Sequence, residues 1–347
     1  MRDVSSGTLS PAATTLDGQR GRWRPSLAGA ISLAVSGALL AGLYRYISLR
    51  HVIDVLRGAN KPWLAVSLAM IAPITVLRAV RFFAVAPRGT VPGIGEALRL
   101  TLVSTTLNVF LPAKTGDLIK SYFVATRGGA SAGVAVSIVV YERLCDVFGL
   151  TFWCVAGWMI ARPVVAGVPS AIWPFLGVVG FACAVLISSE RAAGLVRAAS
   201  QVLTRGPFRR LQALAGGWPD LLRVLRGRRG WIALFSVSLW LVHLIQIWMF
   251  TVALSVSIPF TVCASLAALA LMAGQLPLTL AGLGARDVAL VVLLAGYMEA
   301  EVAAAMGILI ASRGLLPPLA ALPILRPYVS AVVDEARGWR GQVERTP

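Results

Sequence analysis

Two segments of this chain combine a Leu-Pro step with a glycine and an aspartate, and each is followed by an arginine in an apolar stretch. The first segment, residues 111–117, ends at Asp117, and Arg143 follows it in the next apolar run. The second, residues 276–287, ends at an aspartate that precedes Arg313 by the same interval. A guanidinium is always charged, and its rigid fork matches phosphate and carboxylate oxygens. The pattern therefore indicates the binding of an anionic group.

Three charged residues lie close together in the apolar stretch around Arg143. On a helix, Glu142 and Asp146 share a face, and Arg143 reaches Asp146 three residues on. Placing a charge at mid-membrane costs roughly 2.5 to 3.5 kcal/mol on insertion scales, so each charge needs a partner or water. Two interpretations stay open. Either salt bridges tie helices together, or arginines hold an anionic head group while the acids balance or relay charge.

The candidate site residues fall into three groups by their chemistry. Cationic and amide side chains are candidates for binding a lipid head group: Arg143, Arg313, Arg286, Lys114, Lys120 and Asn108. Carboxylates are candidates for charge balance or relay: Asp117, Glu142, Asp146 and Asp287. Proline and glycine are candidates for helix breaks: Pro112, Gly116, Pro277, Gly282 and Gly284.

The elements that must position these residues are membrane helices. Of the 347 residues, 57% are hydrophobic and only 14% are charged, and the mean hydropathy is +0.78. A water-soluble protein of this size does not bury so much apolar surface. We therefore predict an all-α, polytopic membrane protein.

Apolar runs near 20 residues long match a hydrocarbon core of about 30 Å. Clear runs occur at residues 27–44, 62–74 continuing toward 80, 134–160, 171–187, 231–256, 261–280 and 302–322. Two shorter runs, 97–110 and 288–297, suit re-entrant or broken helices, which are tolerated inside a protein or beside water. We expect about seven to nine membrane segments, two of them re-entrant or broken.

The net charge of +17 tells more about how the chain is oriented in the membrane than about its binding partners. Basic residues of membrane proteins gather in cytoplasmic loops and near anionic lipids, so nucleic acid is not expected. We assign residues 189–230 to a basic cytoplasmic loop with amphipathic helices on the inner leaflet; specific capture of anionic lipid is the alternative. Residues 1–25 are expected to form a disordered cytoplasmic leader, and residues 326–347 a polar tail. This multi-pass arrangement in the cell membrane also puts Arg78 and Arg81 in the cytoplasm.

Neither cysteine nor histidine forms a recognisable catalytic or metal-binding pattern. The cysteines lie in apolar segments without CxxC spacing, as expected of small buried residues: Cys145, Cys154, Cys183 and Cys263. His243 is most simply a polar residue bonded within the bundle. We expect no metal, no cofactor and no enzymatic activity.

The two halves of the chain can be aligned on their aspartates. Placing Asp117 on Asp287 also places residues 130–143 on residues 300–313, and both stretches end in arginine. An ancestral duplication is one explanation. The other is chance, because small and apolar residues align with almost any membrane helix.

Four motifs, in order, resemble the flippase-like transmembrane domain of lysylphosphatidylglycerol synthases. They are NVFLP through GD at residues 108–117, YERLCD at 141–146, LP through GLGARD at 276–287, and SR at 312–313. The resemblance covers about residues 25 to 325, and we assign 26–325 to this domain. Asp287 stands where the family usually has Glu, and Lys120 where Arg is common, so the sign of each charge is kept.

The resemblance implies a flippase that moves a lipid with a charged head group: a phospholipid, an aminoacyl-phospholipid, or a polyprenyl- or hopanoid-type lipid. We expect no aminoacyl-transferase domain in this chain. Expected partners are membrane lipids, anionic ones above all, and a separate lipid-synthesising or glycan-assembly enzyme. The alternatives are a membrane-embedded lipid-modifying enzyme or glycosyltransferase, and a membrane assembly partner that transports nothing.

Overall fold

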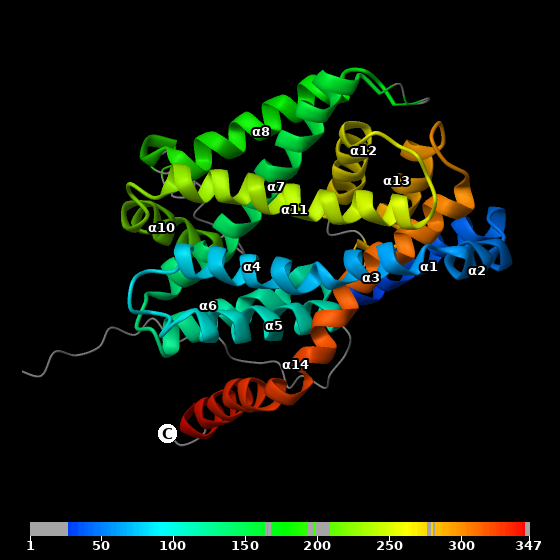
Figure 1. The fold of residues 1–347 in the computed structure, drawn as a ribbon. Helices are drawn as coiled ribbons and strands as arrows, with labels where there is room; N and C mark the ends of the chain where they lie inside the picture. The colour runs from blue at the N-terminus through cyan, green and yellow to red at the C-terminus, as the bar shows by residue number, and fades with distance from the viewer. Residues whose placement is uncertain are drawn as a thin grey trace, which may run out of the picture.

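The computed structural model describes residues 27–163, 165, 168–192, 194, 198, 209–275, 279 and 282–343. These residues form helices and no strand, which confirms the all-α prediction. In chain order (Figure 1) the elements are α1 (Leu27–Tyr46), α2 (Leu49–Gly58), α3 (Lys61–Ala69), α4 (Ile71–Val85), α5 (Ile94–Phe110), the 3-10 helix η1 (Pro112–Asp117), α6 (Leu118–Thr126), α7 (Ala132–Ala161), α8 (Ile172–Ser188), α10 (Arg209–Val224), α11 (Arg229–Ala253), α12 (Phe260–Ala273), α13 (Ala285–Leu294) and α14 (Ala300–Val343).

Each predicted apolar run overlaps a helix, and local signals fix several helix starts. The Ser131 hydroxyl accepts a hydrogen bond from the Val134 N–H and so caps α7, and the Asn60 side chain caps α3 in the same way. Such caps satisfy N–H groups that have no partner within the helix. These two helices therefore begin directly after a short polar residue that caps them.

Four helical stretches are long and apolar enough to cross a membrane: Lys61–Val85, Ala132–Ala161, Arg229–Ala253 and Ala300–Val332. The pair α1 and α2, bent by 83°, makes a fifth if it counts as one span. The protein is thus membrane-embedded, with four or five spans by length and composition among the described residues. The shorter apolar helices α8 and α12 fall below the length of a full span.

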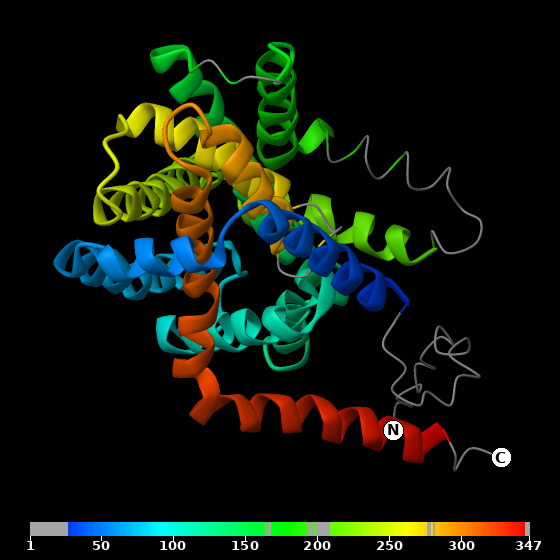
Figure 2. The ribbon, with the colours of Figure 1, turned by 90° about the vertical axis from the view of Figure 1, so that its right-hand side faces the viewer.

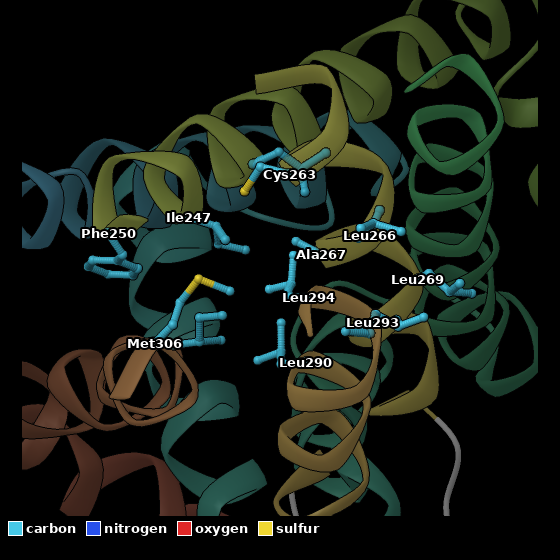
Figure 3. Close-up of a cluster of buried hydrophobic side chains, with 14 of the residues drawn as sticks. Ile247, Phe250, Cys263, Leu266, Ala267, Leu269, Leu290, Leu293, Leu294 and Met306 are labelled. Atoms are coloured by element: carbon cyan, nitrogen blue, oxygen red, sulfur yellow. The ribbon is translucent and has the colours of Figure 1, made fainter. Parts of the chain in front are cut away.

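Helix α7 lies in the middle of the bundle and packs against α8, α10, α11 and α12 (Figure 1). Its C-terminal half, with Leu150 and Cys154, belongs to an apolar cluster with α11, α12, α13 and the start of α14, part of which Figure 3 shows. Its N-terminal half, with Ile138 and Tyr141, belongs to a second apolar cluster with α4, α5, α6 and α10. The charged residues of α7 therefore lie near the middle of a 30-residue helix, where it passes from one cluster to the other.

The first Leu-Pro segment reverses the chain. A side chain on Gly116 would meet the backbone nitrogen of Asn108 at 2.6 Å, so η1 folds back onto the end of α5. Gly128, which follows α6, lies beside Thr90, which precedes α5: a side-chain carbon added to Gly128 would stand 2.5 Å from the Thr90 carbonyl oxygen. Helix α5, η1 and α6 therefore form an excursion that returns to its starting level.

The described residues on either side of the second Leu-Pro step lie against each other. Gly282 has φ +78° and lies against Gly274, so that a side-chain carbon added to Gly282 would stand 2.6 Å from the Gly274 carbonyl oxygen. Gly284, with φ +89°, precedes α13 and faces Leu39 of α1. Glycine tolerates these left-handed conformations. Residues 276–278, including Pro277, lie outside the described part of the chain.

The C-terminal part of α10, in the segment where amphipathic helices were expected on the inner leaflet, packs against the protein. In and just after α10, Trp218, Leu221, Leu222 and Leu225 are buried in the second apolar cluster with Tyr141. This corrects the sequence interpretation for the C-terminal part of that helix, because its apolar face covers α7 rather than lipid.

Basic residues at the end of α10 and the start of α11 gather around one carboxylate. Arg229 and Arg226 both form ion pairs with Glu190, at 2.5 and 3.0 Å. The hydrogen bond from Arg229, with those from Arg226, lowers the pKa of the Glu190 carboxyl below its usual value. Within the predicted basic loop, the residues that join α10 to α11 are thus held by ion pairs to the residue just after α8.

The last helix is long and bent. Figure 2 shows α14 turning sharply between its orange and red parts, and the helix contains Pro317, Pro318, Pro323 and Pro327. Proline removes a backbone hydrogen bond and kinks a helix. Most of the segment predicted as a polar tail, from residue 326 to Val343, is helical.

Replacing Leu222 by Ala should lower the free energy of unfolding by about 2–5 kcal/mol, because the side chain is fully buried between α10 and its neighbours. The matched control is Val224→Ala, two residues away and 43% exposed. The measurement is the thermal unfolding midpoint of the purified protein in detergent. Equal midpoints for the two variants would contradict the packing of α10 on the protein.

Candidate functional site

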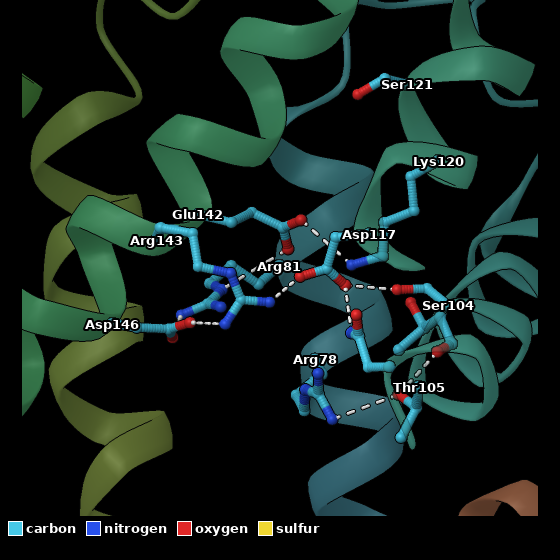
Figure 4. A network of polar contacts seen from close by, with 12 residues as sticks. Arg78, Arg81, Ser104, Thr105, Asp117, Lys120, Ser121, Glu142, Arg143 and Asp146 are labelled. Atoms are coloured by element: carbon cyan, nitrogen blue, oxygen red, sulfur yellow. Dashed lines mark hydrogen bonds and ion pairs between the residues drawn. The ribbon is translucent and has the colours of Figure 1, made fainter. Parts of the chain in front are cut away.

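The site is built around Asp117, which ends η1 where the first Leu-Pro excursion turns into α6. Its carboxylate forms an ion pair with Arg143 of α7 and accepts hydrogen bonds from the Ser104 hydroxyl and from Asn108 Nδ2, the latter at 3.0 Å (Figure 4). Asp117 is 1% exposed. The helix break thus delivers a carboxylate to the arginine that the sequence pattern places after it.

The two carboxylates of α7 have different nearest cations but share Arg81, which also lies 3.9 Å from Glu142. Glu142 pairs with Lys120 of α6 at 3.1 Å, and Asp146 pairs with Arg81 of α4 at 2.7 Å. Asp146 also lies 3.5 Å from Arg143 and accepts a hydrogen bond from Trp240 Nε1 at 3.2 Å. Their repulsion is therefore offset by cations from two other helices.

A second ion pair stands at the other Leu-Pro segment. Arg286 and Asp287, at the start of α13, are 2.7 Å apart, and Asp287 accepts a hydrogen bond from the Gly284 N–H at 3.0 Å. Arg286 also donates to the carbonyl oxygen of Gly307 in α14. Gly307 is needed for this approach, since a side-chain carbon there would lie 2.8 Å from Asp287 Oδ1.

Arg313 makes a different contact from its counterpart Arg143. Its Nη2 contacts Nδ1 of His243 on α11, and its buried Nη1 has no hydrogen-bond partner among the described residues. His243 lies against the Trp240 ring, with 4.9 Å between ring centroids. Asp287, the aspartate that precedes Arg313 in the sequence pattern, is paired with Arg286 instead.

Arg78 is a site residue that the sequence interpretation missed. It was expected in the cytoplasm with Arg81, but both belong to α4, which packs against α5, α7 and α11. Arg81 is 3% exposed, and Arg78 donates to the Thr105 hydroxyl at 3.5 Å. The signal in the sequence was their spacing of three residues, which puts both on one face of an apolar helix.

Two adjoining cavities lie over these side chains. The first, of about 190 Å³, has charged lining from Arg78, Arg286 and Arg313. The second, of about 220 Å³, has charged lining from Arg78, Arg81, Arg143 and Asp146. Their shared lining residues are Arg78, Trp240, His243, Gln275 and Gly314. Arg313 lines the first cavity, and Arg143 lines the second.

The remaining candidates take distinct places. Asn108 lines the second cavity, and Gly282 lines the first. Lys120, proposed as a head-group ligand, lines neither cavity and serves as the partner of Glu142. The side chains of Lys114 and Pro112 lie outside the described ones.

Comparison with known families gives one match. Residues 29–321 match the family model described as lysylphosphatidylglycerol synthase TM region. The chain belongs to this family. No curated protein is significantly similar to the chain. The family and the apolar helices together indicate a membrane protein of lipid metabolism or transport.

Breaking one buried pair should destabilise the protein more than removing both partners. Lys120→Met leaves Glu142 without its nearest cation and should cost about 3–5 kcal/mol, because an unpaired buried charge is expensive. The double variant Lys120→Met, Glu142→Gln should recover most of that loss.

The measurement is again the thermal midpoint in detergent, with the exposed pair Arg57 and Asp54 as control. Arg57→Met should change the midpoint little, since exposed pairs contribute about 0–1 kcal/mol. A harmless Lys120→Met, or a double variant as unstable as the single one, would contradict the assignment of this pair as a buried counter-ion pair.

Proposed function

We propose that the protein is a lipid transporter that moves a lipid with an anionic head group between the leaflets of the cell membrane. The observation that carries the proposal is the state of Arg78 and Arg313. Both line the first cavity, and neither has a carboxylate within ion-pair distance among the described residues. Unpaired cations inside a membrane protein mark substrate or ion pathways.

The helix breaks support the same proposal. Transporter sites are commonly built where interrupted helices meet near the bilayer midplane. Here Gly274 and Gly282 of the second break line the first cavity, and Asn108, where the first excursion turns, lines the second. We propose that both breaks are re-entrant, that the full bundle has seven to nine membrane segments, and that the N-terminus is cytoplasmic.

The two halves also follow one element order. Helix α5, a break, the short helix α6 and the long helix α7 correspond to α12, a break, the short helix α13 and the long helix α14. Asp117 and Asp287 stand near the starts of the two short helices. We propose that this order reflects an internal repeat and that the head group passes between the two copies.

Transport should depend on the two unpaired arginines. In reconstituted phosphatidylcholine vesicles with a trace of fluorescent phosphatidylglycerol, Arg313→Gln and Arg78→Gln should each slow movement about tenfold or more. A lost charge-assisted hydrogen bond is worth about 1.5–3 kcal/mol, and about 1.4 kcal/mol is a factor of ten. The measurement is the leaflet distribution by quenching from outside.

Arg57→Gln is the matched control, because the Arg57 side chain is 79% exposed and lines neither cavity. Transport rates are compared only among variants whose thermal unfolding midpoint equals that of the wild type. Wild-type movement in a folded Arg78→Gln, Arg313→Gln double variant would sink the proposal. A wild-type protein that moves no lipid would favour an assembly partner, and chemical change of the lipid would favour an enzyme.

A further inference from the structure

The described side chains at the site carry more positive than negative charges. Starting from the charged residues that line the two cavities and adding every ion-pair partner gives six cations and four carboxylates among the described side chains. The cations are Arg78, Arg81, Lys120, Arg143, Arg286 and Arg313. The carboxylates are Asp117, Glu142, Asp146 and Asp287.

The pairing also shows where the surplus lies. The nearest cation of each carboxylate is a different one: Arg143 for Asp117, Lys120 for Glu142, Arg81 for Asp146, and Arg286 for Asp287. Two cations remain, and Figure 4 draws one of them, Arg78, with a contact only to the Thr105 hydroxyl. The other, Arg313, contacts the ring nitrogen of His243.

Both surplus cations line the same cavity of about 190 Å³. One anionic group in that cavity can therefore face both. Arg286 lines it too, but its charge is already matched by Asp287. The cavity thus offers two uncompensated positive charges in surroundings where an uncompensated charge is costly.

We propose that the site takes a lipid whose head group carries two negative charges, as a terminal phosphomonoester does, in preference to a phosphodiester with one. This inference rests on the proposed transport function and narrows its substrate class. A phosphomonoester carries about −1.5 to −2 charges at pH 7, which matches the surplus. Its three terminal oxygens, each able to accept more than one hydrogen bond, can accept from both guanidinium groups.

The test compares three fluorescent lipids with the same acyl chains in vesicles that contain the purified full chain: phosphatidic acid, phosphatidylglycerol and phosphatidylcholine. At pH 8, phosphatidic acid should move about tenfold faster than phosphatidylglycerol, because it makes one more charge-assisted contact. Phosphatidylcholine should be slowest. Equal rates for the two anionic lipids would overturn the inference and leave the transport proposal standing, whereas no movement of any lipid would overturn both.

Variants test whether the preference for phosphatidic acid over phosphatidylglycerol depends on the two surplus arginines. Arg78→Gln and, independently, Arg313→Gln should each bring the ratio of phosphatidic acid to phosphatidylglycerol close to one, since a single surplus charge remains. Arg78→Lys, which keeps the charge, and Arg57→Gln, which changes an exposed residue, should keep the ratio. A ratio that survives both glutamine variants would contradict the inference.

Free phosphate carries the same dianionic group as the lipid head group. A separate experiment therefore distinguishes the two ligands. Inorganic phosphate at millimolar concentration should slow the movement of phosphatidic acid in the wild type and have less effect in Arg78→Gln. Thermal stabilisation by phosphate without movement of any lipid would assign the cavity to the free ion and overturn the lipid assignment.

Discussion

The structure depends on the need to match charges at the middle of the bundle. Glu142 and Asp146 stand one turn apart on α7, which contributes side chains to both apolar clusters. Their cations come from α4 and α6, so the ion pairs fix how those helices approach α7. The break at η1 also serves to pair a charge. Gly116 lets the chain fold back, and this brings Asp117 to Arg143.

The sequence predicted the elements well because apolar runs are local signals. It also singled out Asp117, Arg143 and Arg313 from their spacing. Which charges meet could not be read in this way, since pairing depends on how helices pack. Arg81, expected in water, is a main partner of Asp146, and Lys120, expected to bind substrate, is a counter-ion. The amphipathic pattern of α10 was likewise real, but periodicity does not distinguish a face covered by protein from one covered by lipid.

The two copies of the sequence pattern form different ion pairs. This difference accounts for the unpaired positive charge of Arg313 in the first cavity. Arg143 is held by Asp117 and lies near Asp146, whereas Asp287 pairs with its neighbour Arg286, so that Arg313 has no carboxylate partner among the described side chains. Arg78 adds a second cation from α4 at the place where the two cavities adjoin. An ion-paired scaffold on one side and unmatched arginines on the other are what a site for an anionic head group requires.

The most direct test is to identify the lipid that copurifies with the protein by native mass spectrometry. The wild type should retain a lipid with a phosphate head group through mild detergent extraction, and the Arg78→Gln, Arg313→Gln variant should lose it while Arg57→Gln keeps it. Retention of the same lipid by the folded double variant, or a bound lipid without an anionic head group, would contradict the account.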